Sequence, residues 1–417
     1  MNKRKIIINT VAALAAVSVI LASCEDSAPT PQADELTTPV VTTASAREAT
    51  VTASEETTAP ETEIPEETTF DNNAIRFNQT ADSGETLSYY GTEIPYSVTK
   101  LSLNSFDITD VYPIGELTQL TDFSMCDCPV EDISVLSELT NLTTFSMGYS
   151  RVSDISVLSS MTKLTELDLY GNNNLNDFSV LGDLTNLTCL SLWKNGISDA
   201  DVSAFSGMTN LKVLTLDENP ISNLSPLSGM TGLTHLSFWR CYNINDISAL
   251  SGLTNLTSLD LSSTKVADIS ALSGMNKLTS LGIENAGVTD ISALSGVTEL
   301  TYLSLGKNEI TDISVISGMK NLSELWIYNN QIDDISALSG LTELTILDLD
   351  HNKINDISAI SGLTNLTNLY LSGNPVSDIF ALDGMDKLEE LHLDNTSVSE
   401  ADIAAFQEKY PDCIVMN

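Results

Sequence analysis

Apolar and polar positions follow a pattern that returns about every 22 residues from Val98 to the end of the chain. In the unit 344–365, LTILDLDHNKINDISAISGLTN, the leucines at the first, fourth and sixth positions share one face, because strand side chains alternate. Ile346, Asp348 and Asp350 then point to the opposite face. The pattern predicts a short strand, a turn and a short outer helical segment in every unit. Fourteen units begin at Val98, Leu120, Leu142, Leu164, Leu187, Leu211, Leu233, Leu256, Leu278, Leu300, Leu322, Leu344, Leu366 and Leu388.

The core shared by these units, L-x-x-L-x-L-x-x-N, is the sequence signature of a leucine-rich repeat solenoid. We therefore expect an α/β repeat solenoid, a curved leucine-rich repeat array with a parallel β-sheet on the concave face and short 3-10 or helical turns on the convex side. Asn352 occupies the turn of its unit, where a side-chain amide can pair with backbone groups that no strand reaches. Seven of the fourteen units keep Asn at this position.

An aspartate follows the turn at Asp356 and at the equivalent position of twelve units in all. An apolar residue and a serine usually come next, as expected where a carboxylate N-caps a short 3-10 turn. A ladder of carboxylates could instead bind Ca²⁺, but no clustered D-x-D-x-D loop accompanies it. We predict capping, with neither a metal site nor a cofactor.

The two ends of the array should be covered, because an open end exposes apolar residues and an unpaired strand edge. Residues 70–97 do not fit the repeat and contain a hairpin pattern, which predicts an N-terminal β cap before the repeats of 98–398. Residues 399–417 should form a helix and a strand as the C-terminal cap, because Ser399 to Asp402 resembles a capping box.

The N-terminus has the pattern of an export signal over residues 1–23, with three basic residues followed by an apolar stretch. Leu21-Ala22-Ser23-Cys24 resembles a bacterial lipobox, which implies cleavage before Cys24 and lipid attachment to its thiol. Acyl chains on Cys24 would anchor the protein to a bacterial membrane, with the repeats outside the cytoplasm. The alternative is an ordinary secretory signal in which the cysteine is incidental. Residues 24–69 are rich in Thr, Glu and Pro, which predicts a disordered tether.

The charge of the chain is strongly negative, at −39 overall. Residues 98–417 hold 42 acidic residues against 13 basic ones, so the repeats and the C-terminal cap carry −29 of it. Such a surface repels phosphates, which argues against a nucleic-acid partner.

Five cysteines follow Cys24, an odd number that leaves at least one thiol free. Cys128 and Cys241 fall in the Asn position of their units. Cys126 and Cys189 lie three units apart, which is too far for a disulfide between them.

The phrase D-I-S-x-L-S-G-L-T-x-L-T-x-L-x-L, nearly intact at 246–261 and 334–349, resembles the 22-residue repeats of the bacterial internalins. The resemblance spans about 98–417. It implies a surface-displayed, non-enzymatic protein that binds a protein partner on the concave sheet face. The chain lacks the long helical cap, the Ig-like domain and the LPxTG wall anchor of well-known internalins, so host-cell invasion is not carried over.

Each unit leaves three positions pointing outward from its strand, the second, fourth and sixth after its first residue. All three tryptophans of the chain fall at these 42 positions. Tryptophan and tyrosine are enriched where proteins bind partners. Units four to seven also contain the three irregular repeat lengths, which suggests a shaped site. The candidate partner-binding residues are Tyr170, Trp193, Asp217, His235, Trp239, Arg240, Tyr302, Trp326, Tyr328 and Tyr370.

These positions favour a cell-surface lipoprotein that binds a protein, for adhesion or for contacts within the envelope. A carbohydrate-binding module remains open because sugars also stack on aromatic rings, and so does an envelope spacer without a specific ligand. Strand propensity alone could also place aromatic residues on a sheet face. No catalytic residues are expected, since a wet, open sheet should not raise the pKa of carboxylates such as Asp348 and Asp350.

Overall fold

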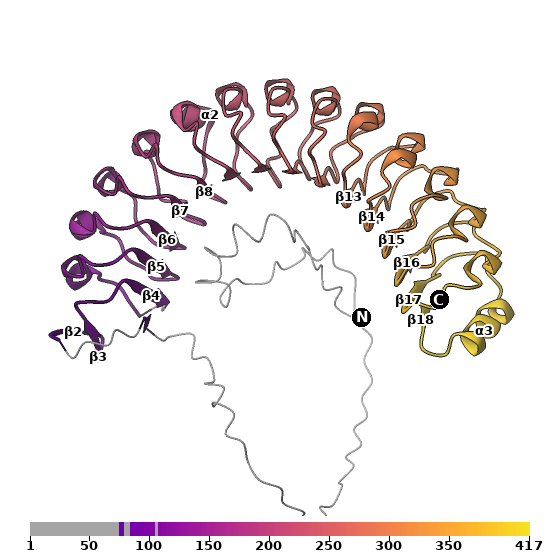
Figure 1. The fold of residues 1–417 in the computed structure, drawn as a ribbon, viewed down its shortest axis with the longest axis horizontal. Helices are drawn as coiled ribbons and strands as arrows, with labels where there is room; N and C mark the ends of the chain where they lie inside the picture. Colours follow the sequence, from indigo (N-terminus) through magenta and orange to yellow (C-terminus); the bar gives the residue numbers. More distant parts are fainter. Residues whose placement is uncertain (1–74, 79–83, 105–106) are drawn as a thin grey trace, which may run out of the picture.

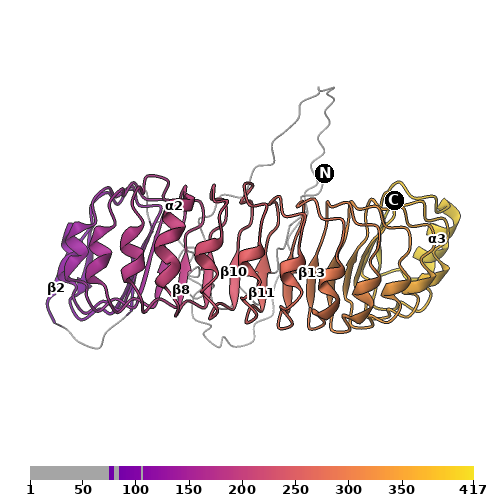
Figure 2. The ribbon, with the colours of Figure 1, turned by 90° about the horizontal axis from the view of Figure 1, so that it is seen from above.

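The computed structural model describes residues 75–78, 84–104 and 107–417. The predicted signal peptide, the lipid attachment site Cys24 and the tether of 24–69 lie outside these residues. The described chain forms a curved solenoid in which strands line the inner side and short helices the outer side (Figure 1). Figure 2 shows the coils standing side by side along the long axis. The predicted solenoid is therefore confirmed.

One sixteen-stranded sheet runs the length of the concave face. Its strands from β4 to β18 are parallel and follow the order of the chain, each pairing with the next. They are β4 (Lys100–Asn104), β5 (Asp122–Cys126), β6 (Thr144–Gly148), β7 (Glu166–Asp168), β8 (Cys189–Ser191), β9 (Val213–Thr215), β10 (His235–Ser237), β11 (Ser258–Asp260), β12 (Ser280–Gly282), β13 (Tyr302–Ser304), β14 (Glu324–Trp326), β15 (Ile346–Asp348), β16 (Asn368–Tyr370), β17 (Glu390–His392) and β18 (Ile414–Met416).

Short 3-10 helices cover the convex side, and the enlarged outer turn of the fifth coil adds the helix α2 (Asp199–Val202). The 3-10 helices are η1 (Tyr112–Glu116), η2 (Ser134–Glu138), η3 (Ser156–Ser160), η4 (Ser179–Asp183), η5 (Ser203–Gly207), η6 (Ser225–Leu227), η7 (Ser248–Leu250), η8 (Ser270–Leu272), η9 (Ser292–Gly296), η10 (Ser314–Gly318), η11 (Ser336–Leu338), η12 (Ser358–Ile360) and η13 (Phe380–Leu382).

The recurring aspartate binds the start of these helices, as predicted, although it lies one residue before the N-cap rather than on it. Asp356 Oδ1 accepts the backbone N–H of Ser358, the first residue of η12, at 2.8 Å. This bond lowers the pKa of Asp356. The same bond forms at Asp110, Asp132, Asp154, Asp177, Asp246, Asp268, Asp290, Asp312, Asp334 and Asp378. Asp199 differs, because it accepts backbone N–H groups of the next coil instead.

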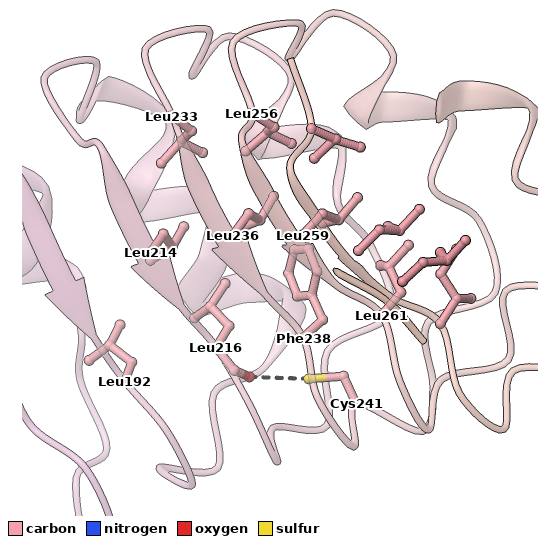
Figure 3. Close-up of a cluster of buried hydrophobic side chains, with 14 of the residues drawn as sticks. Leu192, Leu214, Leu216, Leu233, Leu236, Phe238, Cys241, Leu256, Leu259 and Leu261 are labelled. Atoms are coloured by element: carbon pink, nitrogen blue, oxygen red, sulfur yellow. Dashed lines mark hydrogen bonds between the residues drawn. The ribbon is translucent and has the colours of Figure 1, made fainter. Parts of the chain in front are cut away.

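The core is a stack of apolar layers, one from each coil, with Leu214, Leu236 and Leu259 in register on three successive strands (Figure 3). Asparagine closes this core at the turn. Asn330 Nδ2 donates to the carbonyls of Ile327 in its own coil and Leu305 in the coil before, both at 3.0 Å.

Cysteine replaces this asparagine in two coils, as the sequence predicted. Cys241 Sγ donates to the carbonyl of Leu216 in the preceding coil at 3.1 Å. Cys189, Cys241 and Cys413 are free thiols.

Both ends of the parallel sheet are paired. Strand β1 (Arg76–Phe77) runs antiparallel to β4, and β2 (Thr86–Tyr89) with β3 (Thr92–Pro95) forms a separate hairpin beside it. At the other end the helix α3 (Glu400–Lys409) precedes β18, and Ser399 Oγ accepts the backbone N–H of Asp402.

Candidate functional site

The concave face presents the outward positions as three columns, because each strand pairs with the next without a shift in register. The column of residues that lie six positions after the first residue of their units contains Tyr170, Trp193, Asp217, Trp239 and Tyr328. The core beneath these columns is complete without them, so their side chains are not needed to fill it.

The first aromatic cluster consists of Tyr149, Tyr170 and Trp193. The rings of Tyr170 and Trp193 stack with centroids 6.0 Å apart and planes 15° apart. Tyr149 meets both rings edge-on, at 5.2 Å and 6.3 Å. Because the rings shield one another, Tyr170 is only 7% exposed, whereas Trp193 remains partly exposed.

Glycines make room for this cluster. A Cβ at Gly148 would lie 2.1 Å from the ring of Tyr170, and one at Gly171 would lie 2.6 Å from the ring of Tyr149. Sequence reasoning missed Tyr149, which directly follows the outward trio, seven positions after the first residue of its unit. The backbone there is left-handed, with φ of 48° at Tyr149, and the side chain turns beside the concave face. We call this the edge position.

Trp239 and Arg240 form a separate pair, with the Arg240 guanidinium 4.2 Å from the centre of the Trp239 ring. Arg240 also pairs with Glu218 of the preceding coil at 3.3 Å. Asp217 lies between Trp193 and Trp239, so Trp239 is separated from the first aromatic cluster by a carboxylate.

Asp217 fixes the backbone of the next strand. Its Oδ1 accepts the Ser237 hydroxyl at 2.5 Å and the backbone N–H of Trp239 at 2.7 Å. Burial, together with the charge of Asp260, raises the pKa of Asp217 to about 7, against the effect of these bonds. Burial also raises the pKa of Asp168 to about 6. The expectation that this sheet would leave carboxylate pKa values unraised is therefore wrong for Asp168 and Asp217, because neighbouring side chains exclude water from them.

The second aromatic cluster consists of Trp326, Tyr370 and His392, from β14, β16 and β17. Trp326 and Tyr370 lean towards each other over Asp348 of β15, and their rings stack at 6.2 Å. Tyr370 contacts the His392 ring at 4.5 Å, and His392 Nε2 lies 2.8 Å from Glu390 Oε1. Burial raises the pKa of Glu390, but hydrogen bonds, led by the one with His392, outweigh it and leave the pKa below its ordinary value.

Tyr328 lies down over a glycine in the same way as Tyr170. A Cβ at Gly306 would lie 2.3 Å from the Tyr328 ring. The Tyr328 hydroxyl reaches across this coil and donates to Glu284 Oε2 at 2.8 Å. Lys307, at the edge position, lies 5.7 Å from the centre of the ring.

Two predicted site residues lie in the column that is two positions after the first residue of each unit. His235 stands between Val213 and Ser258, with its Nδ1 2.9 Å from the Thr234 hydroxyl. Tyr302 lies on β13 and is partly exposed. Burial, followed by the charge of Glu284, raises the pKa of Tyr302.

Residues 179–414 match the family described as a leucine-rich repeat region, and residues 140–183 match a two-copy leucine-rich repeat family. Among solved structures, an internalin (InlF) from Listeria monocytogenes is 34% identical to the chain. The match covers 72% of this chain and 89% of the internalin, with a TM-score of 0.66. The chain belongs to the internalin-like leucine-rich repeat proteins.

Two more distant structures share the fold of this internalin-like chain. A leucine-rich repeat protein from Leptospira interrogans is 20% identical, with 74% of this chain and 93% of that protein covered and a TM-score of 0.57. The ectodomain of the Arabidopsis thaliana receptor kinase GASSHO1/SCHENGEN3 is 19% identical, with 74% and 42% covered and a TM-score of 0.57. No curated protein sequence matches the chain.

The described part of this internalin-like chain has neither a metal-binding cluster nor a membrane-spanning helix. There, no three His, Cys, Asp or Glu side chains come together in a way that could hold a metal ion. In the same residues, no helix is long and apolar enough to cross a membrane.

Proposed function

We propose that this internalin-like protein is displayed at a bacterial cell surface and binds a protein partner through its concave face, in adhesion or in contacts within the envelope. The observation that carries the proposal is the pair of aromatic clusters on a sheet whose core is already complete beneath them. Aromatic side chains on a rigid face supply large contact area at little cost in conformational entropy, which suits them to bind a partner.

A ligand on this face would be recognised by side chains rather than by backbone hydrogen bonds. Each internal strand of the sheet has a partner on both sides, and β1 and β18 occupy its two ends. A ligand over the middle coils therefore cannot bind by adding a strand. The Arabidopsis receptor ectodomain, which shares the fold, was solved in complex with CASPARIAN STRIP INTEGRITY FACTOR 2. That complex supports a protein ligand here by analogy of fold.

The test is partner capture from intact cells by cross-linking, with the full chain and with the double variant Trp193→Ala and Trp239→Ala. Both indoles lie outside the leucine core, so the variant should fold and lose the captured partner. Tyr112→Ala is the matched control, because Tyr112 is 67% exposed on η1 of the convex side. Capture that survives in the double variant would contradict a concave-face site. Absence of any specific partner would favour an envelope spacer.

The second candidate is a carbohydrate ligand, which the stacked rings of Tyr170 and Trp193 favour, since flat aromatic faces also pack against sugars. A glycan array probed with the full chain separates the two candidates. Glycan binding that is lost in Trp193→Ala would replace the protein-binding proposal.

Surface display rests on the lipobox sequence at Cys24. Metabolic labelling with a fatty acid, followed by membrane fractionation, tests it. We expect label in the parent protein and none in Cys24→Ala, which should be released from the membrane. Equal labelling of both proteins would contradict lipid attachment at this cysteine.

A further inference from the structure

The concave face from the sixth coil to the last is acidic. No Lys or Arg occupies an outward position in these nine coils, whereas eight carboxylates do. They are Asp217, Asp260, Glu284, Glu324, Asp348, Asp350, Glu390 and Asp394. Such a face produces a negative potential that attracts cationic groups.

Apart from Lys100 in the first coil, the cations of the repeats lie outside these columns. Lys163, Lys277 and Lys387 precede their strands, and each donates to an asparagine of the coil before, at 2.7 to 2.8 Å. Arg240 and Lys307 lie at the edge position over the rings of Trp239 and Tyr328. In these two contacts, aromatic rings of the concave face already bind cationic side chains of the protein itself.

Small residues form much of the floor between the two aromatic clusters, beyond Trp239 of the seventh coil. In the eighth to tenth coils the outward positions include four serines and two glycines, Ser258, Ser262, Ser280, Ser304, Gly282 and Gly306. Glu284 rises from this floor, where it accepts the hydroxyls of Ser304 and Tyr328. The carboxylate of Asp260 lies beside Gly282, with Oδ1 2.9 Å from the place of a glycine Cβ.

The distance between the two aromatic clusters along the sheet matches the length of a short extended polypeptide. Trp193 follows β8 and Trp326 ends β14, six strands further along. At about 4.8 Å per strand, the separation along the sheet is about 29 Å, which an extended polypeptide spans with about nine residues.

From these observations we propose that the concave face binds an extended, lysine- or arginine-rich polypeptide segment, with apolar side chains on the two aromatic clusters and basic side chains over the carboxylates between them. The inference rests on the proposed protein-binding function and specifies the chemistry of the partner. It makes charge complementarity, as well as ring contact, the basis of recognition.

The negative charge of the concave face also argues against two other ligands, the N-terminal segment of this chain and a second copy of it. Residues 25–69 of this chain carry eleven acidic residues and Arg47 as their one basic residue, so this segment would be repelled from the face. A second copy of the chain brings a charge of −39 and is disfavoured for the same reason.

The experiment compares two triple variants of the full chain that change net charge equally. The concave triple is Asp260→Asn, Glu284→Gln and Glu324→Gln. The outer triple is Asp246→Asn, Asp268→Asn and Asp290→Asn, in which the asparagine oxygen can keep the bond to each 3-10 helix. The probe is a fluorescent peptide of about ten residues, with Trp at both ends and alternating Ser and Lys between. A peptide with Glu in place of Lys is the companion probe, and binding is measured by fluorescence anisotropy.

We expect the concave triple to weaken binding of the lysine peptide about tenfold or more, from three lost charge contacts, and the outer triple to leave it within about twofold. The glutamate peptide should not bind. Equal weakening by both triples would mean that only net charge matters and would overturn the inference. Binding of the glutamate peptide would also overturn it. If the cellular partner is lost in the tryptophan double variant but retained by the concave triple, the protein-binding function stands and the cationic ligand is wrong.

Discussion

Asp217 is a titrating group in the concave sheet, and Asp217→Asn tests its energetic effect. The carboxylate accepts two hydrogen bonds through Oδ1 alone, from Ser237 and from the backbone of Trp239. An asparagine oxygen can accept both bonds, but asparagine does not ionise. The substitution therefore removes the charge and leaves the geometry of the next strand in place.

The magnitude follows from the pKa. Asp217 has a pKa of about 7 in the folded protein, against 3.8 for an ordinary aspartate, so the folded state holds its proton more tightly than the unfolded state. Stability contributed by the protonated group is therefore complete below the ordinary pKa and is lost as the pH rises towards 7. Between pH 5 and pH 8 this linkage amounts to about 2.5 kcal/mol of unfolding free energy. Because the residue is partly exposed, this value is an upper limit.

The assay is urea denaturation of the parent and Asp217→Asn at pH 5 and pH 8, with amide hydrogen exchange of β9 and β10 as a local measurement. The advantage of the variant over the parent should grow between the two pH values by up to about 2.5 kcal/mol. Asp246→Asn is the control, since the pKa of Asp246 is lowered by its bond to Ser248 and its difference from the parent should not grow in this interval. A constant difference between Asp217→Asn and the parent at both pH values would refute the reasoning.

Three further substitutions test how individual residues stabilise the repeat units. Asn330→Ala removes three bonds that the side chain donates to carbonyls and one that it accepts from the N–H of Ile310, so it should cost about 2–4 kcal/mol in urea denaturation. Asn330→Cys should cost less, because the thiol of Cys241, at the equivalent position, donates to a carbonyl of the preceding coil. Gly306→Ala should displace the Tyr328 ring at a cost of about 1 kcal/mol, and this cost should disappear in a Tyr328→Ala background if the ring is its cause. Asp356→Ala should lower the melting temperature measurably, whereas Asp356→Asn should lower it less, because the asparagine oxygen can still accept the bond. Equal losses in the two variants would argue against the bond to the 3-10 helix.

The repeat architecture of this protein could be predicted from sequence because its leucine, asparagine and aspartate positions have the same local role in successive units. Leucine periodicity specifies which side chains face inward, and the registers of fourteen strands follow from stacking equal units. The recurring Asn and Asp were predictable for the same reason, since each satisfies backbone groups created by the turn next to it. Even Cys241 fits the rule, because its thiol donates to the carbonyl that an asparagine would reach.

The arrangement of the candidate site could be predicted only in part. Sequence offsets identified Tyr170 and Trp193 as neighbours on one face, but not that the rings stack and shield each other. Trp326 and Tyr370 come from coils that are not adjacent, and their contact depends on rotamers that lean over Asp348. The raised pKa of Asp217 likewise depends on side chains that exclude water, which periodicity does not describe.

Residues at the edge position form a fourth column beside the three outward columns of the concave face. The residue seven positions after the first residue of a unit is held in the left-handed region because its N–H must reach the next strand, as Arg240 N reaches the carbonyl of Ser262 at 2.9 Å. A residue other than glycine pays about 1 kcal/mol to stay there. Glycine would satisfy the same bond without strain, and it does so at Gly171 and Gly373, where the side chains of Tyr149 and His351 fill the space it leaves. Side chains such as Arg240 and Lys307 are thus kept where the backbone does not require them, and both lie over a ring of the face.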